Sequence, residues 1–303
     1  MSFELTILGS NSALPTSNRY PTAQVLDVPG HCFLIDCGEG TQIQLRRNKV
    51  SFSKIQHIFI SHLHGDHYYG LIGLISTMNL MGIKHDLHIY AHSDLKKLIG
   101  PQLDYIRGEM TVIPVFHPLN FKKPQIIFET KKLEVTSFPV KHSLPTCGFL
   151  FREKPKAPNI RKDMIKKYDI PIAQIRKIKE GADFETADGI IIPNKELVSP
   201  PPKPGSYAFC TDTAFHPPIA EIIKDVDLLY HEATFLMDLK ELAAKTLHST
   251  TQEAAEMAKL ANAGKLLLGH FSARFKNISR FEEEARKVFS NSEAAEESKT
   301  YYI

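Results

Sequence analysis

Residues 62–67, with the sequence HLHGDH, hold four side chains that can bind metal ions. Imidazole and carboxylate groups are common zinc ligands. Residues i and i+2 of an extended segment project to the same side, so His62 and His64 can share one ion. Asp66 and His67 follow a glycine that permits a turn, and they can reach a second ion. The alternative is a histidine-rich surface loop, but four ligands directly after a buried-type strand favour a metal site.

The β-branched run at residues 55–60 predicts the buried strand that positions this segment, and a helix is predicted after it over about Tyr69–Met81. The tail Asn291–Thr300 is polar, and we expect it to be frayed. Strands in two groups, each followed by helices, predict two sheets packed face to face under helices. The remaining predicted strands are Phe3–Leu8, Ala23–Val28, Cys32–Ile35, Leu87–Ala91, Ile126–Phe128, Leu133–Phe138, Cys147–Phe151, Tyr207–Cys210, Asp227–Tyr230 and Lys265–Leu268. The other predicted helices of the main domain are Thr41–Arg47, one that Ser93 caps and that runs through about Ile106, Thr251–Leu260 and Ser279–Phe289.

The composition indicates a globular protein without a membrane span. The chain has 303 residues, of which 43% are hydrophobic, which is enough for a substantial core. No apolar run approaches the roughly 18–20 residues that cross a bilayer, and Met1–Leu5 does not resemble the start of a signal peptide. Four scattered cysteines suit the reducing cytoplasm. Cys32 and Cys37 are close enough in sequence that a metal role stays open.

Basic residues are concentrated in one segment of a chain whose net charge is only +3. From Arg152 to Glu180 there are ten basic and four acidic residues, so this segment carries +6 and the rest of the chain −3. Such a block indicates a polyanionic partner, and the alternative is a solvated surface arm. The region 153–204 is rich in Lys and Pro, which predicts a flexible arm inserted into one domain spanning residues 1–303, with one helix near Arg161–Tyr168.

The pattern His-x-His-x-Asp-His after a strand resembles the signature of the metallo-β-lactamase superfamily. Further motifs match in order, and they contain Asp36 (IDCG), His142 (PVKH), Asp212 (CTDT) and His270 (GHFS). The resemblance implies an α+β fold, an αββα sandwich, with Asp36 orienting the ligand loop. It implies two zinc ions per subunit, held by a set of ligands that can also bind manganese. The implied ligands are His62, His64 and His142 for one ion and Asp66, His67 and His270 for the other, with Asp212 bridging.

Three features resemble the ribonuclease Z family, the endonucleases that trim tRNA 3′ ends. They are the segments His231–Thr234 (HEAT) and His248–Thr250 (HST) and the basic insertion between the motifs of His142 and Asp212. This resemblance implies that the chain, as a cytoplasmic homodimer, removes the 3′ trailer of precursor tRNA and leaves a 3′-OH on the tRNA and a 5′-phosphate on the trailer. The alternatives are a phosphodiesterase of the same fold acting on small or cyclic phosphodiesters, and an inert RNA-binding relative.

The chemistry of this reaction suggests a role for several residues. His248 is placed to protonate the departing ribose 3′ oxygen, and Asp66 would accept a proton from the attacking water. Glu232 could orient His248 and raise its pKa, or could be half of an ordinary strand-end pair with His231. A capping box from Thr250 to Glu253 predicts a helix N-terminus suited to phosphate oxygens. The predicted substrate-binding residues are Arg19, Ser249, Thr250, Lys166, Lys167, Arg176 and Lys177.

Two segments depart from the family pattern. Many members have a Pro-x-Lys-x-Arg-Asn loop, in which Ser17 here replaces Lys and Tyr20 replaces Asn. Discrimination against tRNA that already ends in CCA therefore does not follow from the resemblance. The arm has Ile170–Gln174 where long bacterial arms carry a Gly-Pro-rich turn. The basic residues persist, so docking on RNA phosphates is still predicted.

Overall fold

The computed structural model describes residues 3–105, 110–201 and 203–303, and the chain divides into two compact units. The main unit comprises Met1–Phe128, Val135–Phe151 and Gly205–Ile303, and the second comprises Glu129–Glu134 and Arg152–Pro204. In the described chain, no helix is both long and apolar enough to cross a membrane.

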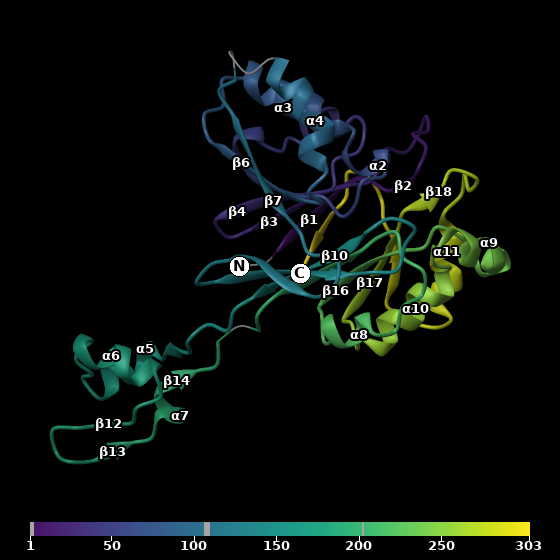
Figure 1. Cartoon of the computed structure of the whole chain (residues 1–303). Coiled ribbons are helices and arrows are strands. Elements are labelled where there is room, and N and C mark those ends of the chain that lie inside the picture. Colours follow the sequence, from purple (N-terminus) through teal and green to yellow (C-terminus); the bar gives the residue numbers. More distant parts are fainter. Residues whose placement is uncertain (1–2, 106–109, 202) are drawn as a thin grey trace. The chain divides into compact units, whose positions relative to one another are not determined.

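The first sheet of the main unit runs from antiparallel strands into parallel ones. Its strands are antiparallel from β20 to β4 and parallel from β4 to β7. The helices α1 (Thr41–Arg47), α3 (Gly70–Leu80) and α4 (Leu95–Tyr105) bury apolar side chains on its outer face (Figure 1). In spatial order the described strands are β20 (Thr300–Tyr302), β1 (Glu4–Gly9), β3 (Ala23–Val28), β4 (His31–Ile35), β5 (Ile55–Phe59), β6 (Asp86–Ala91) and β7 (Ile113–Pro118).

The second sheet is covered by helices from the C-terminal part of the chain. α8 (Ile219–Ile222), α10 (Thr251–Leu260) and α11 (Ser279–Arg286) pack on it through a core rich in Ala and Leu (Figure 1). The strands β15, β16, β17 and β19 are parallel to one another. In spatial order the described strands are β19 (Ser292–Ala294), β17 (Lys265–Gly269), β16 (Leu228–Glu232), β15 (Ser206–Cys210), β10 (Cys147–Glu153), β9 (Leu133–Pro139) and β8 (Gln125–Glu129).

Aromatic side chains join the inner faces of the two sheets. Phe59 on β5 lies with its ring centroid 5.5 Å from those of Phe149 and Phe151 on β10. Phe33 on β4 is also 5.5 Å from Phe151. All four rings are fully buried, and such pairs add stability beyond their burial. The predicted αββα sandwich is therefore confirmed.

The C-terminal segment is ordered, so the prediction that Asn291–Thr300 frays is wrong. β19 extends the second sheet beside β17, and β20 extends the first beside β1. The amide of Ala295 donates to the carbonyl of Leu268 over 2.8 Å. Glu293 forms ion pairs of 2.5 Å with Lys265 and Lys299. The segment can be polar because β19 and β20 lie at the edges of their sheets.

The second unit has an apolar core of its own. The sequence predicts one helix there, and α5 (Lys162–Lys167) is that helix. The structure adds α6 (Ile172–Lys179), α7 (Asn194–Leu197) and two short antiparallel strand pairs, β11 (Asn159–Ile160) with β14 (Val198–Ser199) and β12 (Phe184–Glu185) with β13 (Ile191–Ile192). The expectation that the segment outside α5 has no regular structure is therefore wrong. Apolar side chains from distant parts of the segment pack together and support these elements. The buried ones are Ile170, Ile178, Phe184, Ile192 and Leu197.

Candidate metal centre

The candidate ligands lie just after the ends of strands from both sheets. His62 follows β5, His142 follows β9, Asp212 follows β15 and His270 follows β17. The sequence predicts a turn at Gly65, whereas the structure begins a short helix there, α2 (Gly65–Tyr68), which carries Asp66 and His67. The strand ends and this helix bring all seven predicted ligands together in two groups.

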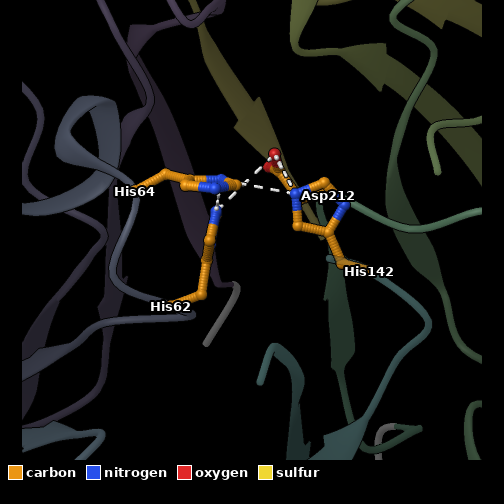
Figure 2. Close-up of side chains that lie close together, drawn as sticks. All are labelled: His62, His64, His142 and Asp212. Carbon is orange, nitrogen blue, oxygen red and sulfur yellow. Dashed lines mark hydrogen bonds and ion pairs between the residues drawn. The ribbon is translucent and has the colours of Figure 1, made fainter. Parts of the chain in front are cut away.

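The first group contains His62, His64, His142 and Asp212 (Figure 2). Nδ1 of His64 lies 2.9 Å from Nε2 of His62 and 3.3 Å from Nε2 of His142. Oδ1 of Asp212 lies 3.7 Å from the Nε2 atoms of His62 and of His142. Ligands at about 2.0–2.1 Å from a tetrahedral ion are about 3.3 Å apart, so these four atoms are spaced as ligands of one ion are.

The second group contains Asp66, His67 and His270, with Asp212 beside it. Oδ2 of Asp212 lies 3.2 Å from Nε2 of His67 and 3.2 Å from Nε2 of His270, so its two oxygens face different groups. Oδ2 of Asp66 lies 3.3 Å from Nε2 of His67. The Nε2 atoms of His67 and His270 are buried without a hydrogen-bond partner. A bound cation is the partner that such nitrogens fit, so the donor set suits divalent metal ions.

Protein groups outside the centre hold the ligand rings in place. The fully buried carboxylate of Asp36 accepts hydrogen bonds from the amide and hydroxyl of Ser61, over 2.7 and 2.8 Å, and contacts Nδ1 of His67 at 2.7 Å. Nδ1 of His142 contacts the carbonyl of Leu247 at 3.1 Å. Each contact occupies one ring nitrogen and leaves the other for the centre.

The backbone is strained at five positions around the centre. Ala13, Asp36, Asp212, Leu247 and His270 have φ between 46° and 57°, the left-handed region that favours glycine. Each costs roughly 1–2 kcal/mol for a side-chain-bearing residue. Such strain is retained where it aims functional groups, and here it turns the chain at the ends of β4, β15 and β17 and after α9 (Lys240–Thr246).

The charges of the centre compensate one another. Burial opposes charge on Asp212, but His270, His67 and His62 hold its pKa well below the usual range. Burial likewise opposes charge on Asp66, and His67 and His270 lower its pKa. Burial would lower the pKa of His67, but Asp66, Asp212 and Asp36 raise it well above that of free imidazole. The carboxylates therefore attract positive charge to this point, as a cation site requires.

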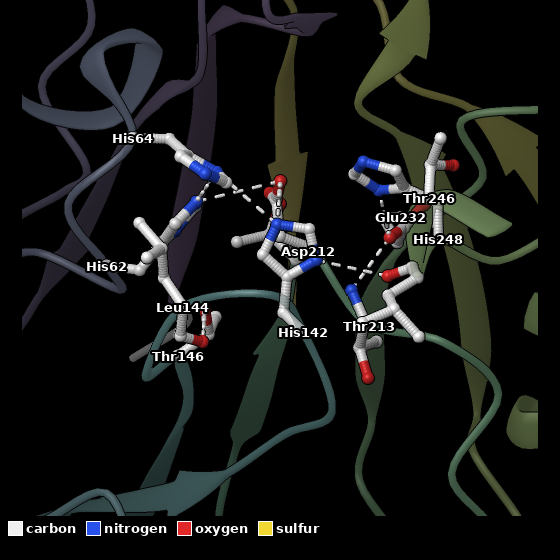
Figure 3. Close-up of polar contacts among 12 residues, drawn as sticks. His62, His64, His142, Leu144, Thr146, Asp212, Thr213, Glu232, Thr246 and His248 are labelled. Atoms are coloured by element: carbon white, nitrogen blue, oxygen red, sulfur yellow. Dashed lines mark hydrogen bonds and ion pairs between the residues drawn. The ribbon is translucent and has the colours of Figure 1, made fainter. Parts of the chain in front are cut away.

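His248 lies close to Asp212 and to His270 of the second group. Glu232 holds its ring in place (Figure 3). Oε1 of Glu232 contacts Nδ1 of His248 at 2.7 Å and accepts the amide of Thr213 over 2.7 Å. Oε2 accepts the hydroxyl of Thr234 over 2.6 Å. Burial would lower the pKa of His248, but Glu232 raises it to about 9. The Glu232 side chain therefore does not form a simple strand-end pair with its neighbour His231, whose Nδ1 contacts the backbone carbonyl of Glu232.

An open cleft of about 540 Å³ gives access to the centre. His64, Asp66, His142 and His248 line it, and so do Ala13 and other residues of the loop that follows β2 (Asn11–Ser12). The amide of Ala13 donates to Oδ2 of Asp66 over 2.8 Å. Sequence motifs do not reveal this contact because a backbone group makes it.

Three predicted substrate-binding residues have structural partners. Ser249 and Thr250 are fully buried, Ser249 donates to the carbonyl of Thr213 over 2.6 Å, and Thr250 forms the predicted capping box of α10. Arg19 donates to Oδ1 of Asn11 and to the carbonyl of Phe275, each over 2.8 Å. We correct the prediction that the side chains of Ser249 and Thr250 contact substrate, because both are buried and their hydroxyls are engaged. Arg19 is half-buried, and its contact with substrate stays a prediction. Lys166, Lys167, Arg176 and Lys177 are exposed on the second unit.

The metal role left open for Cys32 and Cys37 is not supported. Both thiols are buried in the apolar core of the first sheet. Burial raises the pKa of each to about 12, which disfavours the thiolate that binds metal.

Comparison with known proteins gives relatives that match almost the whole chain. The protein named Ribonuclease Z from Phocaeicola vulgatus is 45% identical over 296 residues, which cover 98% of this chain and 96% of that protein. The Ribonuclease Z of Bacteroides thetaiotaomicron is 44% identical and covers 98% and 94%. The family model described as Anti-Pycsar protein Apyc1 matches residues 3–158.

Solved structures agree with the fold. The crystal structure of human tRNase Z, short form, superposes with a TM-score of 0.71 at 26% identity and covers 98% of each chain. The metallo-beta-lactamase fold protein YhfI from Bacillus subtilis superposes with a TM-score of 0.70 at 19% identity and covers 100% of each chain. The metallo-β-lactamase fold is therefore confirmed.

We predict that Asp36→Asn weakens metal binding by about 10- to 100-fold, the usual effect of losing a carboxylate behind a ligand histidine. The substitution keeps the shape of the side chain but removes the charge that orients His67. Titration against a competing chelator measures the affinity. Asp27→Asn on β3, outside the centre, is the matched control. Unchanged affinity in Asp36→Asn would show that Asp36 does not position His67.

Proposed function

This chain belongs to the ribonuclease Z family and, through residues 3–158, to the family described as Anti-Pycsar protein Apyc1, and we propose that it removes the 3′ trailer of precursor tRNA. The products are a tRNA with a 3′-OH and a trailer with a 5′-phosphate. The observation that carries this proposal is the Glu232–His248 pair beside the ligand groups (Figure 3), because it supplies the acid that phosphodiester cleavage needs. Action on small or cyclic phosphodiesters is not favoured, since the full-length relatives are named Ribonuclease Z.

The proposed cofactor is a pair of zinc ions per subunit, for which manganese can substitute. His62, His64 and His142 would hold one, Asp66, His67 and His270 the other, and Asp212 would contribute an oxygen to each. Two bound divalent ions activate water and offset the charge of a phosphodiester. The orphaned nitrogens of His67 and His270 support this assignment.

Two side chains, those of Asp66 and His248, carry out the proton transfers of the reaction. Asp66 accepts a proton from the attacking water while it holds its place through the Ala13 amide. His248 donates a proton to the departing ribose 3′ oxygen, and it keeps that proton at neutral pH because Glu232 raises its pKa. Thr213 and Thr234 fix the Glu232 carboxylate through hydrogen bonds, so the acid keeps one orientation.

The second unit is the proposed docking arm for tRNA. Lys166 and Lys167 lie in the last turn of α5, Arg176 and Lys177 in the last turn of α6, and all four are exposed. Basic side chains held on a folded unit suit the regularly spaced phosphates of an RNA helix, which proteins recognise by shape and backbone.

We also propose that the chain acts in the cytoplasm as a homodimer. The free cysteines are consistent with a reducing compartment. Ile43 on α1, Leu80 on α3 and Met81 are 48%, 88% and 47% exposed, on helices that contact each other. Exposed apolar side chains gathered on adjacent helices are typical of protein interfaces.

The central test is cleavage of precursor tRNA by the metal-loaded protein, with both product ends mapped, on substrates with and without CCA. We expect a single cut after the discriminator base. His248→Ala should lower kcat by about 100- to 10,000-fold, the range for loss of a general acid, while metal content stays at the wild-type level. Intact precursors, combined with hydrolysis of small phosphodiesters, would reject the proposed substrate.

Glu232→Gln keeps the shape of the partner but removes its charge. Because Glu232 raises the pKa of His248, the substitution lowers that pKa, and the protonated acid is lost at lower pH. The alkaline limb of the kcat profile should therefore move to lower pH. An unmoved limb would mean that His248 is not the acid that titrates there.

Replacing Lys166 and Lys167 with Gln tests the arm. We expect KM for precursor tRNA to rise and the slope of log KM against log salt to fall by about one to two, since each lost phosphate contact removes roughly one counterion. The exposed pair Lys122 and Lys123, changed in the same way, is the control. Equal effects from the two pairs would exclude a specific docking role.

The homodimer is tested by sedimentation of the wild-type protein and of Ile43→Asp combined with Leu80→Asp. We expect the wild type at twice the chain mass and the variant at the chain mass, because two buried carboxylates without partners cost several kcal/mol. Leu98→Asp, at an exposed apolar position on α4, should leave the dimer intact. A wild-type protein that sediments as a monomer contradicts the proposal.

A further inference from the structure

Tyr69 is an exposed aromatic side chain in the lining of the cleft, and the proton transfers described above do not use it. It comes two residues after the ligand His67, directly after α2, and is 60% exposed. Single exposed rings are common on protein surfaces, but this one lines the cleft beside Asp66 and His248, where a bound substrate comes within its reach.

The ring of Tyr69 is held against the ligand loop. A Cβ on Gly65 would overlap the Tyr69 ring, so the ring lies directly on the Cα of the residue before Asp66. The amide of Tyr69 donates to the carbonyl of Gly65 over 2.9 Å. The ring of Tyr68 packs edge-on at 4.9 Å. Only a glycine permits this packing, which fixes the ring beside the centre while most of its surface stays open.

The substrate supplies a chemical group that matches this ring. Cleavage at an internal phosphodiester brings a nucleotide to either side of the metal centre, and near the tRNA 3′ end these nucleotides are unpaired. Unpaired bases stack on aromatic side chains, a contact that tolerates any base. A trailer of variable sequence requires that tolerance.

We propose that Tyr69 stacks on a nucleobase that flanks the scissile phosphate and so positions the phosphodiester in the cleft. This inference rests on the proposed cleavage of precursor tRNA. Its ligand is the planar face of one base, and hydrogen bonds to the base edge are not needed. Tyr69 thereby acts as a positioning residue for the substrate, next to Asp66.

The test compares Tyr69→Phe, which keeps the ring, with Tyr69→Leu, which removes it, on precursor tRNA. Two further substrates carry an abasic nucleotide, one at the discriminator position and one at the first trailer position. We expect Tyr69→Leu to lower kcat/KM by about tenfold, in the range for one base–aromatic stack, and Tyr69→Phe to stay close to wild type. On one of the abasic substrates the kcat/KM values of the wild type and of Tyr69→Leu should become equal.

A second readout does not depend on turnover. A precursor with 2-aminopurine at the position that the abasic series identifies should lose fluorescence on rapid mixing with the wild type and with Tyr69→Phe, but not with Tyr69→Leu. Tyr302→Ala, at a tyrosine 71% exposed on β20 and outside the cleft lining, is the control that should behave as wild type. A Tyr69→Leu defect that persists on both abasic substrates overturns the stacking proposal, whereas a wild type that leaves all precursors intact overturns the proposed function itself.

Discussion

The contact between the Asp36 carboxylate and the His67 ring is the interaction on which the metal centre depends. Asp36 follows β4, its other contacts are to Ser61 just after β5, and His67 belongs to α2. A fully buried carboxylate without partners would cost several kcal/mol, so these three elements have to meet. Once they meet, the ring of His67 faces the centre, and the loop before it has little freedom left.

The centre also depends on the position of the two sheets relative to each other within the sandwich. His62 and the helix α2 with His67 follow β5 of the first sheet, while Asp212 and His270 follow β15 and β17 of the second. Asp212 faces both ligand groups, so a shift of one sheet against the other would break both. The packed rings of Phe33, Phe59, Phe149 and Phe151 resist that shift, so the aromatic layer between the sheets helps to maintain the geometry of the centre.

The sequence predicts which side chains meet at the candidate centre, because they lie in short motifs after strands, and a strand end determines where the next side chains project. It does not predict the contacts of Ala13 and Leu247, since backbone atoms make them and no side-chain motif reveals them. β19 and β20 have three residues each, too few to show an alternating pattern. The small core of the arm is also hidden, because its apolar residues are spread between Ile170 and Leu197 without a helical or strand period.

The pairing of β20 with β1 has a consequence for how the protein is made. Glu4 pairs with Tyr302, so β1 leaves the ribosome almost 300 residues before the strand that completes its pairing. At roughly 5–20 residues per second, that wait lasts on the order of 15–60 seconds. During this time β1 presents an open edge with Leu5 and Ile7 beside it, which is a template for wrong pairing between nascent chains. Pairing of β1 with β3 covers only the other edge, so the nascent chain needs protection of this edge, such as binding by a chaperone, until β20 is made.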